Sequence, residues 1–346
     1  MTLFGLNARI VTLVGAAFIA GIGFSAQAED LPGSGKEASP ARPNWDSFWF
    51  GQAILDKAMV RLGYEVDAPK TLGVPAIFTS MSHGELHYMA DTILPNHAGL
   101  YEKTEGTVRR IGPLMSPGTI QGYAVDKKTA DAHNIRYLED LLDPNIARLF
   151  DQDGDGRADM IGPNPDWTGS SAVVDHHMTE LGLKDSIKVV QGNYTTLSAD
   201  AVGRFKGGDA IFIYTWFPNP VTMDLLPGED LVWLELKNPT LPKDQWEQYQ
   251  ALTDAPGCAN PCDIGWLPTT YYIAASEEWA KENPAAVAFF ERIKMKLSDR
   301  VWQNGLMKNG EKSEEDISRH ADIWIEQHRD EFEAWIAEAI EVGSEN

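Results

Sequence analysis

The chain has 346 residues and carries 29 Lys and Arg against 51 Asp and Glu, a formal net charge of −22. With 43% hydrophobic and 23% charged residues, its composition is that of a folded protein rather than a disordered one, and its length leaves room for two domains. The excess of negative charge disfavours nucleic-acid backbones and anionic membranes as partners, because both would repel it.

The first 28 residues predict a signal peptide. Arg9 precedes an uncharged stretch over residues 10–24, and Ala26-Gln27-Ala28 fits the small-x-small pattern that signal peptidase cleaves. This apolar stretch is shorter than the ~20 residues that span a bilayer as a helix. We therefore expect cleavage after Ala28 and export to the periplasm.

Short β-rich runs alternate with helical stretches after the leader, which predicts an α/β architecture. The first helix is expected over residues 45–62, because its apolar residues follow helical spacing and Gly63 can end it. Further helices are expected over residues 129–133, 147–150, 171–181, 198–206, 277–297 and 317–340. Strands are expected over residues 75–79, 122–125, 187–190, 210–214, 231–236 and 269–274.

An acidic loop imitates the first part of a calcium-binding loop. Its carboxylates are Asp151, Asp153, Asp155 and Asp159. Gly156 stands at the sixth position as in such loops, but the twelfth position is Gly162 rather than the usual Glu. The alternatives are a structural calcium site and a plain acidic turn whose Asp side chains bond their own backbone.

The two cysteines, Cys258 and Cys262, lie in a Cys-Ala-Asn-Pro-Cys loop. In an oxidising compartment we expect them to form a small structural disulfide rather than stay as free thiols. A metal site would need further ligands, and neither a His nor a second Cys pair lies nearby in the sequence.

Three aromatic stretches are candidates for a binding site. Trp167 is followed by the expected helix start, where the N–H groups of Thr168 and Gly169 would be open to an anion. Trp216 lies at the end of an expected strand, where ligands of open α/β folds collect. Trp45 and Trp49 mark the start of the first helix and either face a cleft or pack on the helix.

Sequence motifs of enzymes are missing: there is neither Gly-x-Ser-x-Gly nor His-Glu-x-x-His, and neither a phosphate-binding nor a dinucleotide-binding glycine loop. His176 and His177 are adjacent, so on a helix they diverge by about 100° and cannot hold one metal together. This favours a binding protein over an enzyme.

Several stretches resemble the periplasmic glycine betaine/proline betaine-binding proteins of ABC importers (the ProX type), from about Trp45 to Ala339. They include residues 121–131, 149–159 and 279–286, together with Gln191-Gly-Asn-Tyr194, Tyr214-Thr-Trp216 and Val232-Trp-Leu234. The resemblance implies a two-lobed α/β periplasmic-binding-protein fold of type II, with a ligand cleft between the lobes. Residues 29–118 with 240–346 are expected to form lobe 1, and residues 119–239 lobe 2.

That family holds a quaternary ammonium group in a box of three Trp side chains. The second and third of these match Trp167 and Trp216, whereas the first falls on Ile93. Another ring should therefore replace the missing wall, and we expect Trp45 to do so rather than Trp49.

The resemblance also implies a site for the ligand carboxylate. His97 matches a His that contacts the carboxylate, and Thr168 and Gly169 match the residues whose amides complete the site. A disulfide that brackets the second Trp in the best-known member is absent here, because Pro163 and Gly169 stand at its positions.

The expected function is capture of a small methylated ammonium osmolyte, such as glycine betaine, for the permease subunits of an ABC importer. We expect a monomer with no cofactor beyond the possible structural calcium. Trimethylamine N-oxide and choline are alternative ligands. An enzyme acting on methylated amines and a structural, adhesin-like module are alternatives of other classes.

Overall fold

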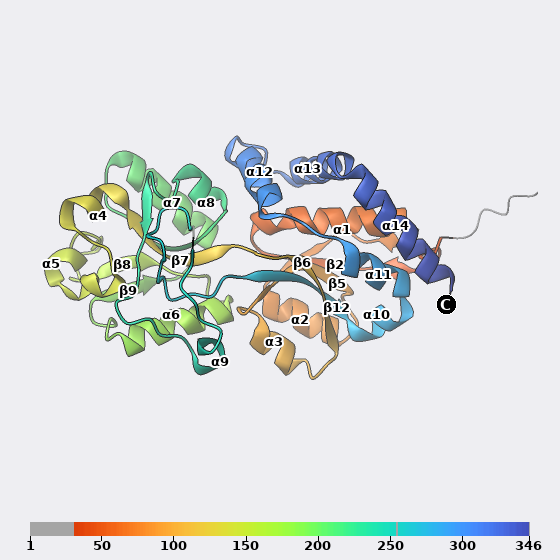
Figure 1. Cartoon of the computed structure of the whole chain (residues 1–346), viewed down its shortest axis with the longest axis horizontal. Coiled ribbons are helices and arrows are strands. Elements are labelled where there is room, and N and C mark those ends of the chain that lie inside the picture. Colours follow the sequence, from red (N-terminus) through yellow and green to blue (C-terminus); the bar gives the residue numbers. More distant parts are fainter. Residues whose placement is uncertain (1–30, 254, 346) are drawn as a thin grey trace, which may run out of the picture. The chain divides into compact units, whose positions relative to one another are not determined.

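The computed structural model describes residues 31–253 and 255–345, and the predicted signal peptide lies outside this part of the chain. Two five-stranded sheets form the centres of two lobes (Figure 1). The first has the strand order β4-β2-β5-β12-β6 and contains β2 (Pro40–Pro43), β4 (Lys70–Leu72), β5 (Tyr88–Leu94), β6 (Val108–Met115) and β12 (Thr270–Ser276). The second has the order β11-β7-β10-β8-β9 and contains β7 (Ile120–Asp126), β8 (Ala158–Ile161), β9 (Ile187–Val190), β10 (Phe212–Phe217) and β11 (Leu231–Trp233). A short parallel pair, β1 (Glu37–Ala38) and β3 (Glu65–Val66), accompanies the first lobe.

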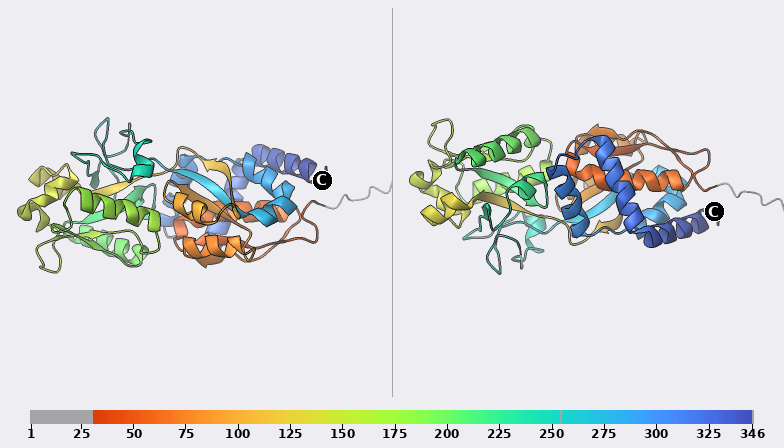
Figure 2. Two further views of the ribbon diagram at one scale, coloured as in Figure 1. Left: turned by 90° about the horizontal axis from the view of Figure 1, so that it is seen from below. Right: turned by 90° about the horizontal axis from the view of Figure 1, so that it is seen from above.

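Helices cover both faces of each sheet (Figures 1 and 2). Those of the first lobe are η1 (Asp46–Phe48), α1 (Trp49–Arg61), α2 (Val74–Ser82), α3 (Ala98–Lys103), α10 (Glu277–Glu282), α11 (Pro284–Arg292), α12 (Leu297–Lys308), α13 (Glu314–Gln327) and α14 (Arg329–Ser344). Those of the second are α4 (Lys127–His133), η2 (Leu138–Leu142), α5 (Pro144–Ala147), α6 (Thr168–Glu180), α7 (Tyr194–Gly207), α8 (Pro220–Asp224) and α9 (Lys243–Trp246). The α/β prediction and the two-lobed fold are thereby confirmed.

The first helix follows the sequence pattern closely. One turn of 3-10 helix, η1, leads into α1, whose inward face buries Phe50, Ile54, Leu55, Ala58 and Met59. Gly63 follows with φ of +93°, a left-handed conformation that glycine adopts without a steric cost. The predicted end of the helix is therefore correct.

The strand expected over residues 75–79 is wrong, because this segment is helix α2. Pro75 stands in its first turn, where a missing N–H costs no helical hydrogen bond. Val74, Ile77, Phe78 and Met81 recur at helical spacing and are buried. A proline in the first turn is typical of a helix start, and the strand prediction did not take Pro75 into account.

Two long helices of the sequence prediction are each broken. Residues 277–297 form α10 and α11, interrupted at Asn283 before Pro284, and α11 ends at Arg292. Residues 317–340 lie on α13 and α14, with a break at His328. Proline explains the first break, because its ring disfavours helical geometry in the preceding residue.

The chain crosses between the lobes along two segments that bond to each other. Gly118 N donates to Thr269 O at 2.8 Å, and Thr269 N donates to Thr119 O at 3.2 Å. Residues before the second crossing bond to the second lobe, since Leu236 N donates to Asp263 O and Trp233 Nε1 to Pro256 O, at 2.7 and 2.8 Å. These contacts favour a boundary close to Thr269 over the expected one at residues 239 and 240.

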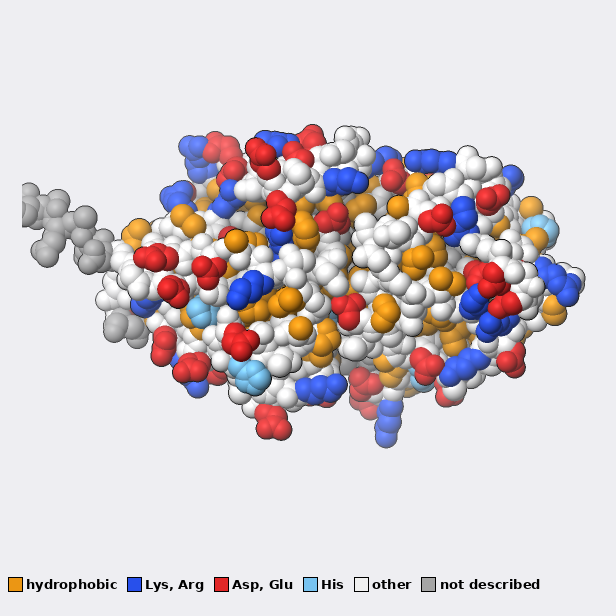
Figure 3. Space-filling model, turned by 180° about the vertical axis from the view of Figure 1, so that it is seen from behind, with side chains coloured by type: hydrophobic (Ala, Val, Ile, Leu, Met, Phe, Trp, Pro, Cys, Tyr) orange, Lys and Arg blue, Asp and Glu red, His pale blue; other side chains and the backbone are white. Residues whose placement is uncertain are grey.

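The predicted disulfide between Cys258 and Cys262 is present in the second lobe. In the part of the chain that the structure describes, no helix combines the length and apolar character needed to cross a membrane. Figure 3 shows acidic and basic side chains interspersed over one face of the molecule, so the net charge of −22 does not gather there into a region of one sign.

Candidate ligand-binding site

A small cavity of about 40 Å³ lies where loops of the two lobes meet. From the first lobe it is lined by Trp45, Phe48, Val74, Ile93, Asn96, His97, Leu100, Thr269 and Tyr271. From the second it is lined by Thr119, Gln121, Asp166, Trp167, Thr168, Gly169, Ser170, Tyr214 and Trp216. The structure thus brings together all seven residues that the sequence proposed for ligand binding.

Three Trp rings meet edge to face at this cavity. Trp167 is central: its ring centroid lies 5.0 Å from that of Trp45, with planes at 74°, and 5.6 Å from that of Trp216, with planes at 71°. Near-perpendicular rings present faces and edges to the same space. The indole N–H groups of all three are buried and lack an acceptor among the described residues.

Trp49 is held away from the cavity. Its Nε1 donates to Pro43 O at 2.8 Å, and the guanidinium of Arg42 lies 3.7 Å from the ring centroid. Its role is packing at the start of α1. Trp45 lines the cavity together with Ile93, whereas Trp49 does not, and the replacement of the missing wall by Trp45 stays a prediction.

A second layer of aromatic rings, which the sequence prediction missed, supports the three Trp side chains. Phe48 packs against Trp45 with centroids 5.2 Å apart, and Tyr271 stacks on Phe48 at 5.5 Å. On the other side, Tyr194 lies 5.2 Å from Trp167 and 5.1 Å from Trp216. The Tyr194 hydroxyl is fixed in turn by Thr215 Oγ1 at 3.0 Å.

A buried ion pair between Arg300 and Asp91 lies behind the first-lobe part of this layer. Arg300 comes from α12, and its Nη1 donates to Ser47 O at 2.8 Å. Its guanidinium carbon lies 5.1 Å from the Phe48 ring and 5.5 Å from the Tyr271 ring. Burial raises the pKa of Asp91 above its usual value, although the positive charge of Arg300 acts in the opposite direction.

His97 is fixed by the turn that follows β5. Ile93 N donates to His97 Nδ1 at 3.0 Å, so Nδ1 is an acceptor and the ring proton belongs on Nε2. Burial lowers the pKa of His97 to about 4. Near neutral pH, His97 is therefore an uncharged donor through Nε2 at the cavity.

Helix α6 begins at Thr168, three residues before the predicted start. Trp167 is its N-cap residue and supplies no side-chain hydrogen bond to the first turn. The amides of Thr168 and Gly169 consequently have no acceptor within the helix, and the positive end of the helix dipole faces the cavity with them. This is an arrangement that suits a carboxylate.

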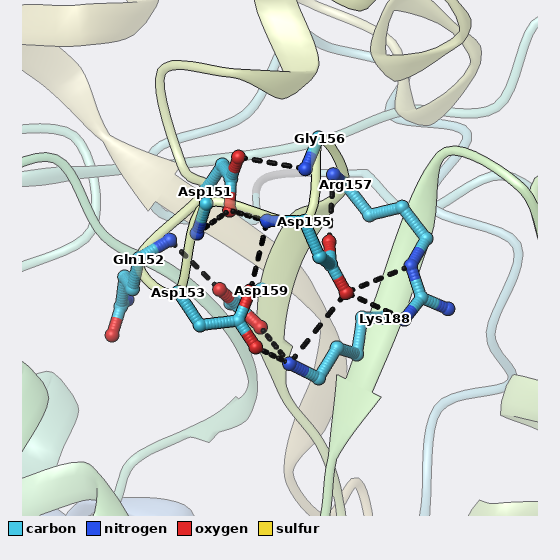
Figure 4. Close-up of polar contacts among 9 residues, drawn as sticks. Asp151, Gln152, Asp153, Asp155, Gly156, Arg157, Asp159 and Lys188 are labelled. Atoms are coloured by element: carbon cyan, nitrogen blue, oxygen red, sulfur yellow. Dashed lines mark hydrogen bonds and ion pairs between the residues drawn. The ribbon is translucent and has the colours of Figure 1, made fainter.

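The acidic loop lies away from this cavity and is shown in Figure 4. Three carboxylate oxygens lie within 4.8 Å of one another, one each from Asp151, Asp153 and Asp159. The Lys188 ammonium forms an ion pair with Asp153 and lies 3.3 Å from Asp159 Oδ1.

Backbone amides satisfy much of the rest of the loop. The Asp151 carboxylate accepts from Gly154 N and Gly156 N, both at 2.8 Å. Gly162 N bonds to Val190 O in the neighbouring strand, so the twelfth position does not turn toward the carboxylates. The bonds from backbone amides to Asp151 are those of an acidic turn, and calcium binding stays a prediction.

The adjacent histidines are packing residues. His177 is fully buried, with Nδ1 2.8 Å from Tyr123 Oη and Nε2 2.9 Å from Thr240 O. His176 Nε2 lies 2.8 Å from Thr240 Oγ1 instead. Burial lowers the pKa of His177 to about 4.

Residues 37–327 match the family model of the substrate-binding domain of ABC-type glycine betaine transport systems. The chain is 36% identical over 334 residues to the glycine betaine/proline betaine-binding periplasmic protein of Escherichia coli, covering 96% of this chain and 98% of the relative. It is 37% identical over 311 residues to the glycine betaine-binding periplasmic protein OusX of Dickeya dadantii, covering 89% and 91%.

Solved structures agree on the fold. Lactococcal OpuAC in its closed, liganded conformation with glycine betaine superposes with a TM-score of 0.63 at 19% identity, covering 87% of this chain and 100% of that one. An ABC-transporter choline-binding protein in complex with choline superposes with a TM-score of 0.64 at 17% identity, covering 88% and 96%.

Proposed function

Because the chain belongs to the family of substrate-binding proteins of ABC-type glycine betaine transport systems, we propose that it captures glycine betaine and delivers it to the permease subunits of an ABC importer. Family membership sets aside the alternatives of an enzyme acting on methylated amines and of a structural module.

The observation that carries the ligand class is the set of three Trp rings at one small cavity. A methylated ammonium group cannot donate hydrogen bonds, and its charge is spread over an apolar surface. Aromatic faces provide apolar contact and electrostatic attraction together, about 0.5–2 kcal/mol per ring. In this proposal the ring of Trp45 forms the third wall of the box, because the position of the family's first Trp is occupied by Ile93 in this chain.

In this proposal the carboxylate of betaine binds to the hydrogen-bond donors that line the same cavity. His97 is uncharged there and offers Nε2–H, and the first amides of α6 offer further donors. A carboxylate gains charge-assisted hydrogen bonds from such donors, whereas a neutral hydroxyl gains weaker ones.

Choline is the second candidate, and Asp166 is the observation that favours it. Its side chain lines the cavity beside Trp167, and its Oδ2 accepts from Asn44 Nδ2 at 3.1 Å. A carboxylate beside the rings attracts a ligand with a net positive charge. Trimethylamine N-oxide, whose oxygen is bonded directly to nitrogen, would leave the donors of the carboxylate site unused.

Competition calorimetry with the three ligands tests the proposal. We expect glycine betaine to bind at least tenfold more tightly than choline, because a buried donor left without a partner costs about 1–3 kcal/mol. A preference for choline or the N-oxide would transfer the proposal to that ligand, and binding of none of them would refute it.

We further propose that the mature chain begins at residue 29 in the periplasm and acts as a monomer without nucleic-acid partners or a cofactor. The periplasmic location of the relatives supports the first point. Amino-terminal sequencing of the exported protein and light scattering would test these points.

A further inference from the structure

Asn96, in the loop after β5, bonds across the cleft to the second lobe. Its Nδ2 donates to Gln121 Oε1, and Gln121 Nε2 donates to Asn96 Oδ1, both at 3.0 Å. The same Nδ2 lies 2.9 Å from Ser170 Oγ in the first turn of α6. One half-buried side chain of the first lobe is thereby joined to a strand and a helix of the second.

The second-lobe partners of Asn96 are buried and fixed from behind. The Tyr214 hydroxyl lies 2.9 Å from Gln121 Oε1 and 3.1 Å from Ser170 Oγ. The exposed fractions of Gln121, Ser170 and Tyr214 are only 3%, 4% and 2%. Because these groups are shielded from water, losing a partner leaves donors and acceptors that solvent compensates poorly.

The backbone of Asn96 also approaches α6 closely. A Cβ atom added at Gly169 would lie 1.8 Å from Asn96 O, a distance that no side chain could accept. The lobes can therefore meet at this point only because residue 169 is glycine. The contact lies beside the amides that we propose for the carboxylate.

Asn96 directly precedes His97, so it connects the two halves of the carboxylate site. His97 comes from the first lobe, while the amides of Thr168 and Gly169 come from the second. We propose that Asn96 is a positioning residue that fastens the His97 loop to the start of α6 when the lobes close, so that both halves act on one carboxylate. This inference rests on the proposed function and assigns Asn96 no charge interaction with the ligand.

A contact that exists only in the closed state contributes to ligand affinity, because the ligand shifts the equilibrium between open and closed states. Its loss should let the closed complex open sooner. We therefore expect Asn96→Ala to raise the Kd for glycine betaine about tenfold or more, mainly through faster dissociation. We expect a smaller rise for choline, whose hydroxyl depends less on the joined carboxylate site.

Lys308→Met is the matched control. Lys308 Nζ on α12 also bonds across the lobes, donating to Met223 O on α8, but Lys308 is exposed and neither residue lines the cavity. We expect its betaine Kd to stay within threefold of wild type.

The measurements are calorimetric Kd values for both ligands, dissociation rates from stopped-flow Trp fluorescence, and the Tm of the ligand-free protein. The ligand-free Tm of Asn96→Ala should match wild type, because the contact belongs to the closed state. A lowered Tm with proportionate losses for both ligands would indicate a merely structural role and overturn the proposal. Unchanged betaine binding in Asn96→Ala would also overturn it.

Exchange of the two amides provides a second test. Asn96→Gln combined with Gln121→Asn keeps an amide on each side, and we expect its betaine Kd to lie within threefold of wild type. A double variant as weak as Asn96→Ala would contradict the pairing. If wild-type protein itself binds neither betaine nor choline, the proposed function fails, which is a result distinct from failure of the Asn96 proposal.

Discussion

Trp45 and Trp167 meet edge to face across the two lobes, with ring centroids 5.0 Å apart and planes at 74°. The first precedes α1 and the second precedes α6. The aromatic site therefore takes residues from both lobes, since neither lobe alone provides all three Trp rings of the cavity.

Trp45 and Trp49 offer a matched pair for testing which ring replaces the missing wall. We expect Trp45→Ala to weaken betaine binding at least tenfold, about 1.4 kcal/mol, because it removes a ring from the cavity. Trp49→Ala should lower the Tm through lost packing against Arg42 and leave the Kd within twofold. Calorimetry and thermal melts check both, and the reverse pattern would assign the wall to Trp49.

The other two rings should also be required. We expect Trp167→Ala and Trp216→Ala each to weaken betaine binding tenfold or more, with the circular dichroism of a folded protein retained. Unchanged affinity in both variants would remove the aromatic-box interpretation.

His97 should determine the preference for a carboxylate. We expect His97→Ala to reduce the affinity ratio of betaine to choline, because the Nε2–H donor serves the carboxylate and not the trimethylammonium group. His87→Ala is the control, since His87 stacks on Trp279 at 5.3 Å and does not line the cavity. A ratio that falls equally in both variants would speak against a direct role of His97.

The buried histidines predict that stability falls in mild acid. Burial lowers the pKa of His97 and His177 from 6.5 to about 4, so the unfolded chain takes up protons below about pH 6.5 while the folded protein does not. The free energy of unfolding should fall as the pH drops from 6.5 toward 4, by up to about 1.4 kcal/mol per pH unit for each histidine.

Urea unfolding of the ligand-free protein between about pH 6.5 and 4.5 measures this slope, because this range lies between the pKa of 6.5 in the unfolded chain and the pKa of about 4 in the folded protein. We expect His177→Gln to reduce it and His133→Gln, at an exposed position on α4, to leave it unchanged. An identical slope in the wild type and both variants would mean that the buried histidines are not its source.

The acidic loop predicts a response to calcium that depends on Lys188. In the wild type the Lys188 ammonium lies among the carboxylates, so we expect the same Tm with calcium and with chelator. Lys188→Met leaves the carboxylates without this charge, and calcium should then raise the Tm. Lys184→Met, at a lysine paired with Asp175, is the control. A calcium-dependent Tm in the wild type would instead show that the ion displaces Lys188.

Local signals account for what the sequence could predict. The end of α1 and the position of Trp167 directly before the first amides of α6 follow from nearby residues. The strand at β5 was missed because its residues are buried on both faces, so they do not alternate between apolar and polar.

The residues that support the site could not be predicted from the sequence, for a different reason. Arg300 and Ser47 bond across 253 positions, and Asn96 meets Ser170 across 74. Such pairs depend on how the two sheets and their helices are arranged. The residues next to Arg300 or Asn96 in the sequence do not indicate which distant residue each will contact. The family resemblance identified residues that line the cavity, but not the residues that hold them in place.

The position of β12 has a consequence for the order in which the lobes can fold. In the first sheet β5 and β6 bond to β12 and not to each other, yet β12 follows the whole second lobe in the chain. A chain that emerges amino-terminus first therefore exposes two unpaired strand edges until residues 270–276 arrive, while the second sheet can already assemble from contiguous sequence. This raises the contact order of the first lobe, which slows its folding, and makes unfinished chains prone to aggregation. The first lobe, whose sequence begins the described chain, is therefore expected to complete its folding after the second lobe.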